Sequence, residues 1–202
     1  MISVITYANL GKGKYRVSFD NGMTCVLYRG EAARLSLSEG CLITEEQYDI
    51  LINEIIGKRA RKRAMHLLEK MDMTEYKLRE KLKRNDYPDE CIDLAVEYVK
   101  SYDYINDDRY GHNFVRLSQD RFSRQQIYQK LMQRGVKREL ISHALEDEYE
   151  SEEEEMIKKL LEKRHFRGEL TEEKEFQRIY SYILRRGYSS NIILKEMRNF
   201  SC

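Results

Sequence analysis

One short stretch of this chain contains residue types that could do chemistry. From Tyr104 to Val115 the sequence reads YINDDRYGHNFV, which places Asp107 and Asp108 shortly before His112. Carboxylates and an imidazole can bind a divalent metal, and Asp108 and His112, four residues apart, would share one face of a helix. A metal-dependent hydrolase is therefore one interpretation of this stretch.

The same residues are also typical of the start of a helix. Asp107 can accept hydrogen bonds from the free N–H groups of a first turn, and both aspartates favour the positive end of the helix dipole. The other three histidines, His66, His143 and His165, are far apart in the sequence. Because no third ligand stands at a recognisable spacing, capping explains the residues better, and we predict no metal site, no catalytic residue and no cofactor.

Other signs of catalysis are also missing from the sequence. It contains no Gly-x-Ser-x-Gly, no Gly-x-x-x-x-Gly-Lys-Ser/Thr and no Gly-x-Gly-x-x-Gly. The four cysteines are scattered without a CxxC pair, which favours reduced thiols over a zinc site or disulfides. No signal-peptide pattern and no apolar run of about 20 residues occurs. We therefore expect a cytoplasmic protein that is not an enzyme and has no membrane contact.

Charge is segregated along the chain, although the net charge is only +1. Basic side chains dominate residues 57–70 and 116–138, whereas residues 146–155 are almost entirely acidic. Such blocks can attract a charged partner, although solvated helix faces are an alternative reading. Many of the 15 tyrosines lie on apolar helix stripes, where a packed ring is the normal role and base stacking is the alternative.

The elements that would carry these residues begin with short strands. Apolar residues alternate up to Phe19, Asn21-Gly22 is typical of a hairpin turn, and a second β-prone run follows, with SVITY as a third candidate strand. From Thr44 the period becomes helical, and Thr44 with Gln47 predicts a capping box. One long bent helix or two helices fit residues 44–71 equally well.

The remainder of the chain repeats itself at a spacing of about 50 residues. Segments 78–96, 127–145 and 179–197 align without gaps. Each predicts a helix, a left-handed C-cap and a second amphipathic helix. The cap positions are Asp86, Gly135 and Gly187. Each pair follows another helical stretch, at 59–71, 107–119 and 151–165, and capping boxes are predicted at Ser123 with Gln126 and at Ser151 with Glu154.

The predicted fold is mainly α, with three tandem three-helix repeats preceded by a small antiparallel β-sheet and a helix. One repeat buries little surface, so neighbours must stack, which predicts an elongated curved array. The predicted parts are a β extension at 1–43, a connecting helix at 44–58, and repeats at 59–104, 105–150 and 151–202.

Residues 104–136 resemble the central signature of the RecX family of regulatory proteins. The matching residues are Ile105, Asp107, Asp108, Arg109, Tyr110, Phe114, Val115, Ile127, Leu131, Arg134, Gly135 and Val136. The N-terminal strands resemble the extension of long Gram-positive members. Two departures are Gly111, where the family usually has Ala, and Phe122-Ser123, where a Gly often stands.

The resemblance implies a monomeric partner of the RecA recombinase that binds RecA and its filament on single-stranded DNA. It implies restraint of the RecA ATPase, strand exchange and coprotease activities, and hence regulation of DNA repair, homologous recombination and the SOS response. Weak direct DNA contact is a further expectation. The alternative is a stand-alone helical-repeat protein that binds nucleic acid.

Charge clustering predicts which side chains meet the partner. The candidates are Arg109, Arg116, Arg121, Arg124, Lys130 and Arg134, followed by Arg59, Arg61 and Arg63. On the helix that starts at Asp107 we expect Tyr110, Phe114 and Leu117 to form the buried stripe. That arrangement would leave Arg109 and Arg116 free to face the partner.

Overall fold

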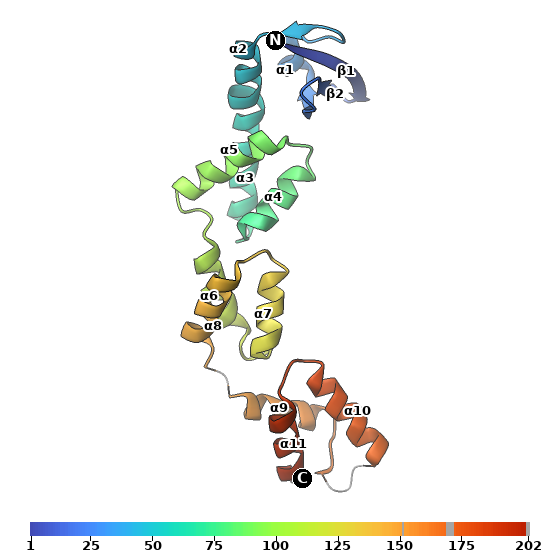
Figure 1. Ribbon diagram of the computed structural model, residues 1–202, viewed down its shortest axis with the longest axis vertical. Helices are drawn as coiled ribbons and strands as arrows, with labels where there is room; N and C mark the ends of the chain where they lie inside the picture. The colour runs from blue at the N-terminus through green and yellow to red at the C-terminus, as the bar shows by residue number, and fades with distance from the viewer. Residues whose placement is uncertain (151, 169–171, 201–202) are drawn as a thin grey trace. The chain divides into compact units, whose positions relative to one another are not determined.

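The computed structural model describes residues 1–150, 152–168 and 172–200, which belong to two compact units, Met1–Asn106 and Asp107–Cys202. Figure 1 shows the first unit as a small sheet followed by helices, and the second as helices throughout its described part. No helix among the described residues is both long and apolar enough to cross a membrane.

The N-terminal strands form a four-stranded antiparallel sheet in the order β3-β2-β1-β4. The strands are β1 (Ile2–Gly11), β2 (Lys14–Phe19), β3 (Thr24–Tyr28) and β4 (Leu42–Ile43), and a short helix, α1 (Arg29–Arg34), follows β3. The predicted hairpin is confirmed, because β2 pairs with β3 around Gly22, whose φ of 84° is the left-handed conformation that a tight turn requires.

One continuous helical segment connects the sheet to the first repeat. It consists of α2 (Glu45–Asp49), the π-helical turn η1 (Ile50–Ile56) and α3 (Gly57–Lys70), and its start at Thr44 has the predicted capping box. The backbone N–H of Gly57 donates to the carbonyl of Ile52, and a Cβ on Gly57 would lie 2.5 Å from that oxygen. Glycine therefore permits the wider turn.

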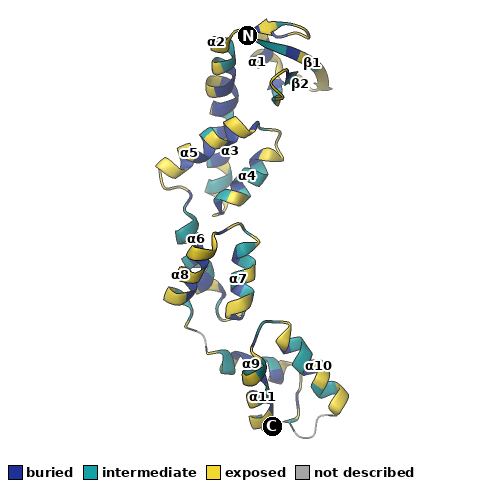
Figure 2. Cartoon of the chain, in the orientation of Figure 1, coloured by how far each residue is buried: buried dark blue, intermediate teal, exposed yellow. Residues whose placement is uncertain are grey.

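The predicted three-helix groups are confirmed. They are α3 to α5, α6 to α8 and α9 to α11, and each group contains buried residues, which are dark blue in Figure 2. The helices after α3 are α4 (Glu75–Lys83), α5 (Asp89–Ser101), α6 (Asp107–Ser118), α7 (Arg124–Met132), α8 (Arg138–Glu148), α9 (Glu153–Lys163), α10 (Glu173–Leu184) and α11 (Ser190–Asn199). The first group shares a single hydrophobic core with the sheet, whereas the second and third groups each have a hydrophobic core of their own.

The turns between the second and third helices of the groups adopt the predicted conformation. The three cap residues have φ of 60° at Asp86, 80° at Gly135 and 84° at Gly187. After the first two caps, the backbone N–H of Tyr87 and of Val136 donates back into the preceding helix. The capping box of Ser123 with Gln126 is also present. The box predicted at Ser151 lies outside the described residues.

The buried stripe predicted for α6 is wrong. Leu117 is 80% exposed, and the buried residues of this helix are Gly111, Val115 and Ser118. The cause is the close approach of α6 to α8 at Gly111, where an added Cβ would lie 3.5 Å from the Cβ of Ala144. Small residues allow this approach, so the face that carries them turns inward and the larger rings lie at its edge.

The predicted five-part division of the chain and the predicted curved array stay predictions. Within each unit, the contacts between helices show which side chains lie close together.

Candidate interaction surface

The second repeat presents a surface that is rich in cations. Between Arg121 and Arg138 the sequence contains no Asp or Glu. The helix α7 lies inside this range and buries Ile127 and Leu131. Its other positions carry mainly glutamine and basic residues, so the solvent-facing side of α7 is polar and positively charged.

Two basic side chains of α7 and the turn after it lie over aromatic rings. The ammonium nitrogen of Lys130 is 4.3 Å from the ring centre of Phe122, and the guanidinium carbon of Arg134 is 4.5 Å from that of Phe114. The negative face of an aromatic ring attracts a cation at such distances. Unlike a carboxylate, the ring does not cancel the charge, and among the described residues no carboxylate lies within 4 Å of the Lys130 ammonium.

Arg124 and Arg121 begin the same surface. Arg124 donates from Nη1 to the carbonyl of Leu145 at 3.1 Å and has its guanidinium carbon 5.9 Å from the ring centre of Tyr149. Both arginines are exposed. Arg124 therefore joins α7 to α8 while its charge stays at the surface.

Arg116 is not free, contrary to the prediction. It donates from Nε and Nη2 to both carboxylate oxygens of Glu148, at 2.8 and 2.6 Å. These hydrogen bonds lower the pKa of the Glu148 carboxyl. Arg116 therefore joins α6 to α8. Arg109, in the first turn of α6, is exposed.

A groove extends the basic surface toward the third repeat within the same unit. Its volume is about 280 Å³ and its lining residues are Gln125, Gln126, Gln129, Lys130, Gln133, Arg185, Arg186 and Gly187. The hydroxyl of Ser123 donates to the carbonyl of Arg186, which fixes the start of α7 beside the end of α10. The groove thus combines three cations with amide side chains.

Arg186 also belongs to a stack that the charge blocks did not predict. Its guanidinium carbon is 4.6 Å from the ring centre of Tyr182, and that of Arg164 is 3.9 Å from the same ring. A hydrogen bond from Arg164 and the charge of Arg186 lower the pKa of the Tyr182 hydroxyl. The repeat alignment contains the signal, since Arg186 precedes Gly187 as Arg134 precedes Gly135.

The predicted basic residues of α3 make their contacts within the first unit. Arg59 donates to the carboxylate of Glu31 and to the carbonyl of Val26, both at 2.6 Å, and its side chain is 23% exposed. Arg61 donates to the carbonyl of Asn53 at 3.0 Å. The Nε of Arg63 is buried without a hydrogen-bond partner. Arg59 therefore fastens α3 to β3 and α1, whereas Arg61 bonds within its own helical segment.

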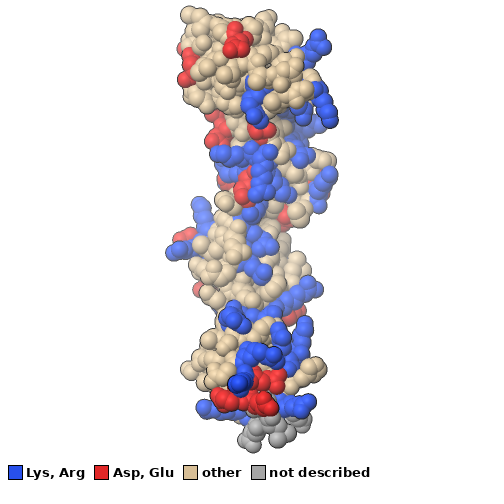
Figure 3. All heavy atoms as spheres, turned by 90° about the vertical axis from the view of Figure 1, so that its right-hand side faces the viewer, with Lys and Arg blue, Asp and Glu red and all other residues tan. Residues whose placement is uncertain are grey.

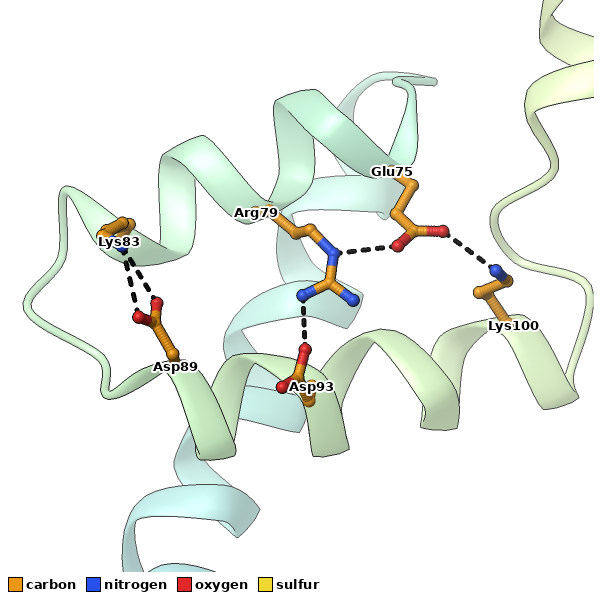
Figure 4. Close-up of polar contacts among 6 residues, drawn as sticks. All are labelled: Glu75, Arg79, Lys83, Asp89, Asp93 and Lys100. Atoms are coloured by element: carbon orange, nitrogen blue, oxygen red, sulfur yellow. Dashed lines mark hydrogen bonds and ion pairs between the residues drawn. The ribbon is translucent and has the colours of Figure 1, made fainter. Parts of the chain in front are cut away.

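Ion pairs occupy the seam between α4 and α5 (Figure 4). Glu75 accepts from Nε of Arg79 at 2.8 Å and from Nζ of Lys100 at 2.9 Å, and Arg79 also donates to Asp93 at 2.5 Å. Next to this network Lys83 pairs with Asp89. In the first repeat the cations of this seam are thus each paired with a carboxylate, whereas the second repeat has Tyr128, Met132 and Tyr149 at the positions of Arg79, Lys83 and Lys100.

Figure 3 shows one face of the molecule with Lys and Arg side chains along both units, while acidic side chains gather most visibly toward the C-terminal end. The two aspartates of the opening motif lie in the first turn of α6, at the positive end of its dipole. His112 points from the same helix toward His143 and Asp147 of α8.

Comparison with known proteins identifies the three-helix groups. Family models described as the first, second and third three-helix domains of RecX match residues 60–98, 106–145 and 152–196. The "Regulatory protein RecX" of Caldanaerobacter subterraneus subsp. tengcongensis is 36% identical over 165 residues, which are 81% of each chain. That of Clostridioides difficile is 23% identical over 206 residues and covers 99% of this chain and 97% of its own.

Two solved structures share the fold. One, described as a crystal structure of regulatory protein RecX, has a TM-score of 0.65 at 23% identity and covers 98% of this chain and 99% of its own. The other, of RecX from Lactobacillus salivarius, has a TM-score of 0.61 at 20% identity and covers 71% of this chain and 96% of its own.

Proposed function

Since the chain belongs to the RecX family of regulatory proteins, we propose that it binds the RecA recombinase and the filament that RecA forms on single-stranded DNA. Binding restrains the ATPase, strand-exchange and coprotease activities of the filament. In this way the protein regulates DNA repair and homologous recombination without catalysing a reaction. It acts as a monomer in the cytoplasm, where its partners are.

The acid-free surface of α7 carries this proposal. Lys130 and Arg134 lie over aromatic rings, and the adjoining groove adds Arg185 and Arg186. A filament on single-stranded DNA offers two kinds of negative charge, the phosphates and the acidic side chains of the protein. A surface with several cations is suited to either, and electrostatic attraction speeds its encounter with the filament.

The test is the ATPase activity of RecA on single-stranded DNA, titrated with this protein. Wild-type protein lowers the ATPase rate in a saturable manner. Lys130→Glu raises the concentration that gives half of the effect several-fold, because it places a negative charge in the groove. No effect of the wild type at micromolar concentration would contradict the proposal.

A matched control exists at the same position of the first repeat. Lys81 is the equivalent of Lys130 in the repeat alignment, so Lys81→Glu makes the same change of charge on a repeat whose neighbouring cations are paired. Its titration curve is expected to overlay that of the wild type. An equal loss in both variants would mean that net charge, rather than the α7 surface, sets the affinity.

The stand-alone nucleic-acid reading predicts a different result. Affinity for single-stranded DNA without RecA would be high and would fall steeply with added salt. We expect direct DNA binding to be weak, with tight binding only when RecA is present.

A further inference from the structure

The seam between α6 and α8 brings together four side chains that are known metal ligands. Each helix contributes one aspartate and one histidine four residues apart, Asp108 with His112 on α6 and His143 with Asp147 on α8. Such spacing places both side chains on one face of each helix. At this seam Asp108 lies near both histidines, and Asp147 also lies near both of them.

The distances among these side chains are short. Nε2 of His112 and Nε2 of His143 lie 3.1 and 3.6 Å from the same carboxylate oxygen of Asp147. The two imidazole rings are 5.6 Å apart, edge to face. One ligand atom each of Asp108, His112 and His143 lies within 4.8 Å of the others.

The backbone fixes the tautomer and the direction of one imidazole. Nδ1 of His112 lies 3.0 Å from the carbonyl oxygen of Asp108. A carbonyl can only accept, so Nδ1 carries the hydrogen and the lone pair of the neutral ring is on Nε2, which points toward α8. Histidine ligands of metals commonly have this arrangement, in which a hydrogen bond at one nitrogen orients the other.

We propose that Asp108, His112, His143 and Asp147 form a binding site for one Zn²⁺ ion. Two imidazole nitrogens and two carboxylates match the donors that zinc accepts, whereas Mg²⁺ and Ca²⁺ prefer oxygen alone. At zinc–ligand distances of about 2.0–2.2 Å, tetrahedral ligands stand roughly 3.4 Å apart. The exposure of His143 (64%) and Asp147 (48%) leaves these two side chains room to rotate toward that spacing.

Zinc at this position would brace the repeat that carries the basic surface. The Arg116–Glu148 ion pair joins the same two helices one turn further along α6, so the metal extends an existing polar seam. A ligand that binds only the folded state stabilises that state. Zinc therefore raises the thermal stability of the second repeat while leaving α7 exposed.

Protons compete with zinc for the imidazoles. Hydrogen bonds to the Asp108 backbone and to Asp147 raise the pKa of His112, so its proton is retained to higher pH than in a free histidine. His143, Asp108, Asp147 and Glu148 also face this ring. Because zinc binds the neutral imidazole, bound zinc displaces these protons.

The experiment is calorimetric titration of the metal-free, full-length chain with zinc chloride at pH 7.5. We expect one ion per chain. His143→Ala and Asp147→Asn each weaken binding about tenfold or more, as losses of metal-site groups commonly do. Both positions are largely exposed, so neither change should unfold the repeat, which circular dichroism checks. His66→Ala is the matched control, because it removes an exposed histidine of α3 that lies in the other unit.

A thermal melt with and without excess zinc supplies the second measurement. The wild type and His66→Ala melt at higher temperature with zinc, and His143→Ala does not. The proposal is overturned if no saturable binding occurs up to about 100 μM zinc, or if binding is unchanged in His143→Ala, which would place the ion on a thiol such as Cys41. RecA is not needed, so the result is independent of the proposed partner.

Discussion

The first and second repeats have the same arrangement of helices but differ in how the charged side chains on their surfaces are paired. Four positions of the seam between their second and third helices make the difference clear. In the first repeat they are Glu75, Arg79, Asp93 and Lys100. In the second repeat they are Arg124, Tyr128, Ser142 and Tyr149. A network of ion pairs in one repeat is thus replaced in the other by a single arginine facing a tyrosine ring.

This difference separates two uses of charge. In the first repeat the cations of the α4–α5 seam stabilise the fold, because Arg79, Lys83 and Lys100 each pair with a carboxylate of the same repeat. In the second repeat the ion pair lies in the α6–α8 seam instead, and under the proposed function the cations of α7 contact the partner. The following changes test that separation.

The largest effect is expected in the apolar core that the two repeats share. Leu82 and Leu131 are equivalent and both have 0% exposure, so alanine at either site leaves a cavity and costs about 2–5 kcal/mol of unfolding free energy. Urea denaturation followed by helical circular dichroism measures the loss. If Leu131→Ala cost less than 1 kcal/mol, the second repeat would not depend on its core in the way the first does.

Acidic residues on α7 should make the second repeat resemble the first in binding. Gln125→Glu with Gln126→Glu adds two carboxylates in the first turn of α7, as Glu75 does in α4. Helix stability is maintained or increased, since acids favour the positive end of the dipole and Glu preserves the capping box. We expect the concentration for half-maximal restraint of the RecA ATPase to rise about tenfold, with no loss of thermal stability. A loss of both would indicate a folding defect instead.

The turn after the second helix provides a smaller pair of changes with opposite signs. Gly135 has φ of 80°, so alanine there costs about 1–2 kcal/mol. Asp86 occupies the same turn of the first repeat with φ of 60°, and glycine there should stabilise by about 1 kcal/mol. Denaturation midpoints of Gly135→Ala and Asp86→Gly give both values. Shifts of the same sign would mean that the two turns are not equivalent.

Local signals in the sequence predicted most of the fold, because caps, turns and helical period depend on neighbouring residues. The hairpin at Gly22, the caps at Asp86 and Gly135, and the three-helix groups all follow from such signals. The buried face of α6 could not be predicted from such signals, because hydrophobicity alone favours Leu117 over Gly111 as a buried residue. Close helix packing reverses that choice, and a single sequence does not reveal which helix the small residue will meet.

For the candidate sites, too, local features could be predicted from the sequence and contacts between helices could not. The clustering of basic residues on α7 is visible in the sequence, since it is local. The partners of Arg116 and His112 are not, because Glu148 and Asp147 lie on another helix more than thirty residues away. The sequence separation of His143 from His112 predicts no shared site, yet their rings lie 5.6 Å apart. Contacts between helices are what the sequence analysis missed.

The smallest effect concerns the ion pairs of the first repeat and depends on pH. Burial raises the pKa of Glu75, but hydrogen bonds from Lys100 and Arg79 outweigh it and hold the pKa below the usual 4.5. A carboxyl whose pKa is lower in the folded state contributes stability above the unfolded pKa, and loses it as pH falls through the folded pKa. Glu75→Gln should therefore cost about 1 kcal/mol near pH 7.

The cost should disappear below pH 4.5, as the wild-type carboxyl takes up its proton and becomes neutral like the glutamine. The measurement is the difference in unfolding free energy between the wild type and Glu75→Gln from pH 7 to pH 3. Glu97→Gln, at an exposed position of α5, is the control and should show almost no difference at any pH. If the difference in unfolding free energy stayed constant down to pH 3, the shape of the Glu75 side chain rather than its charge would stabilise this seam. The contrast between the two repeats would then have no electrostatic basis.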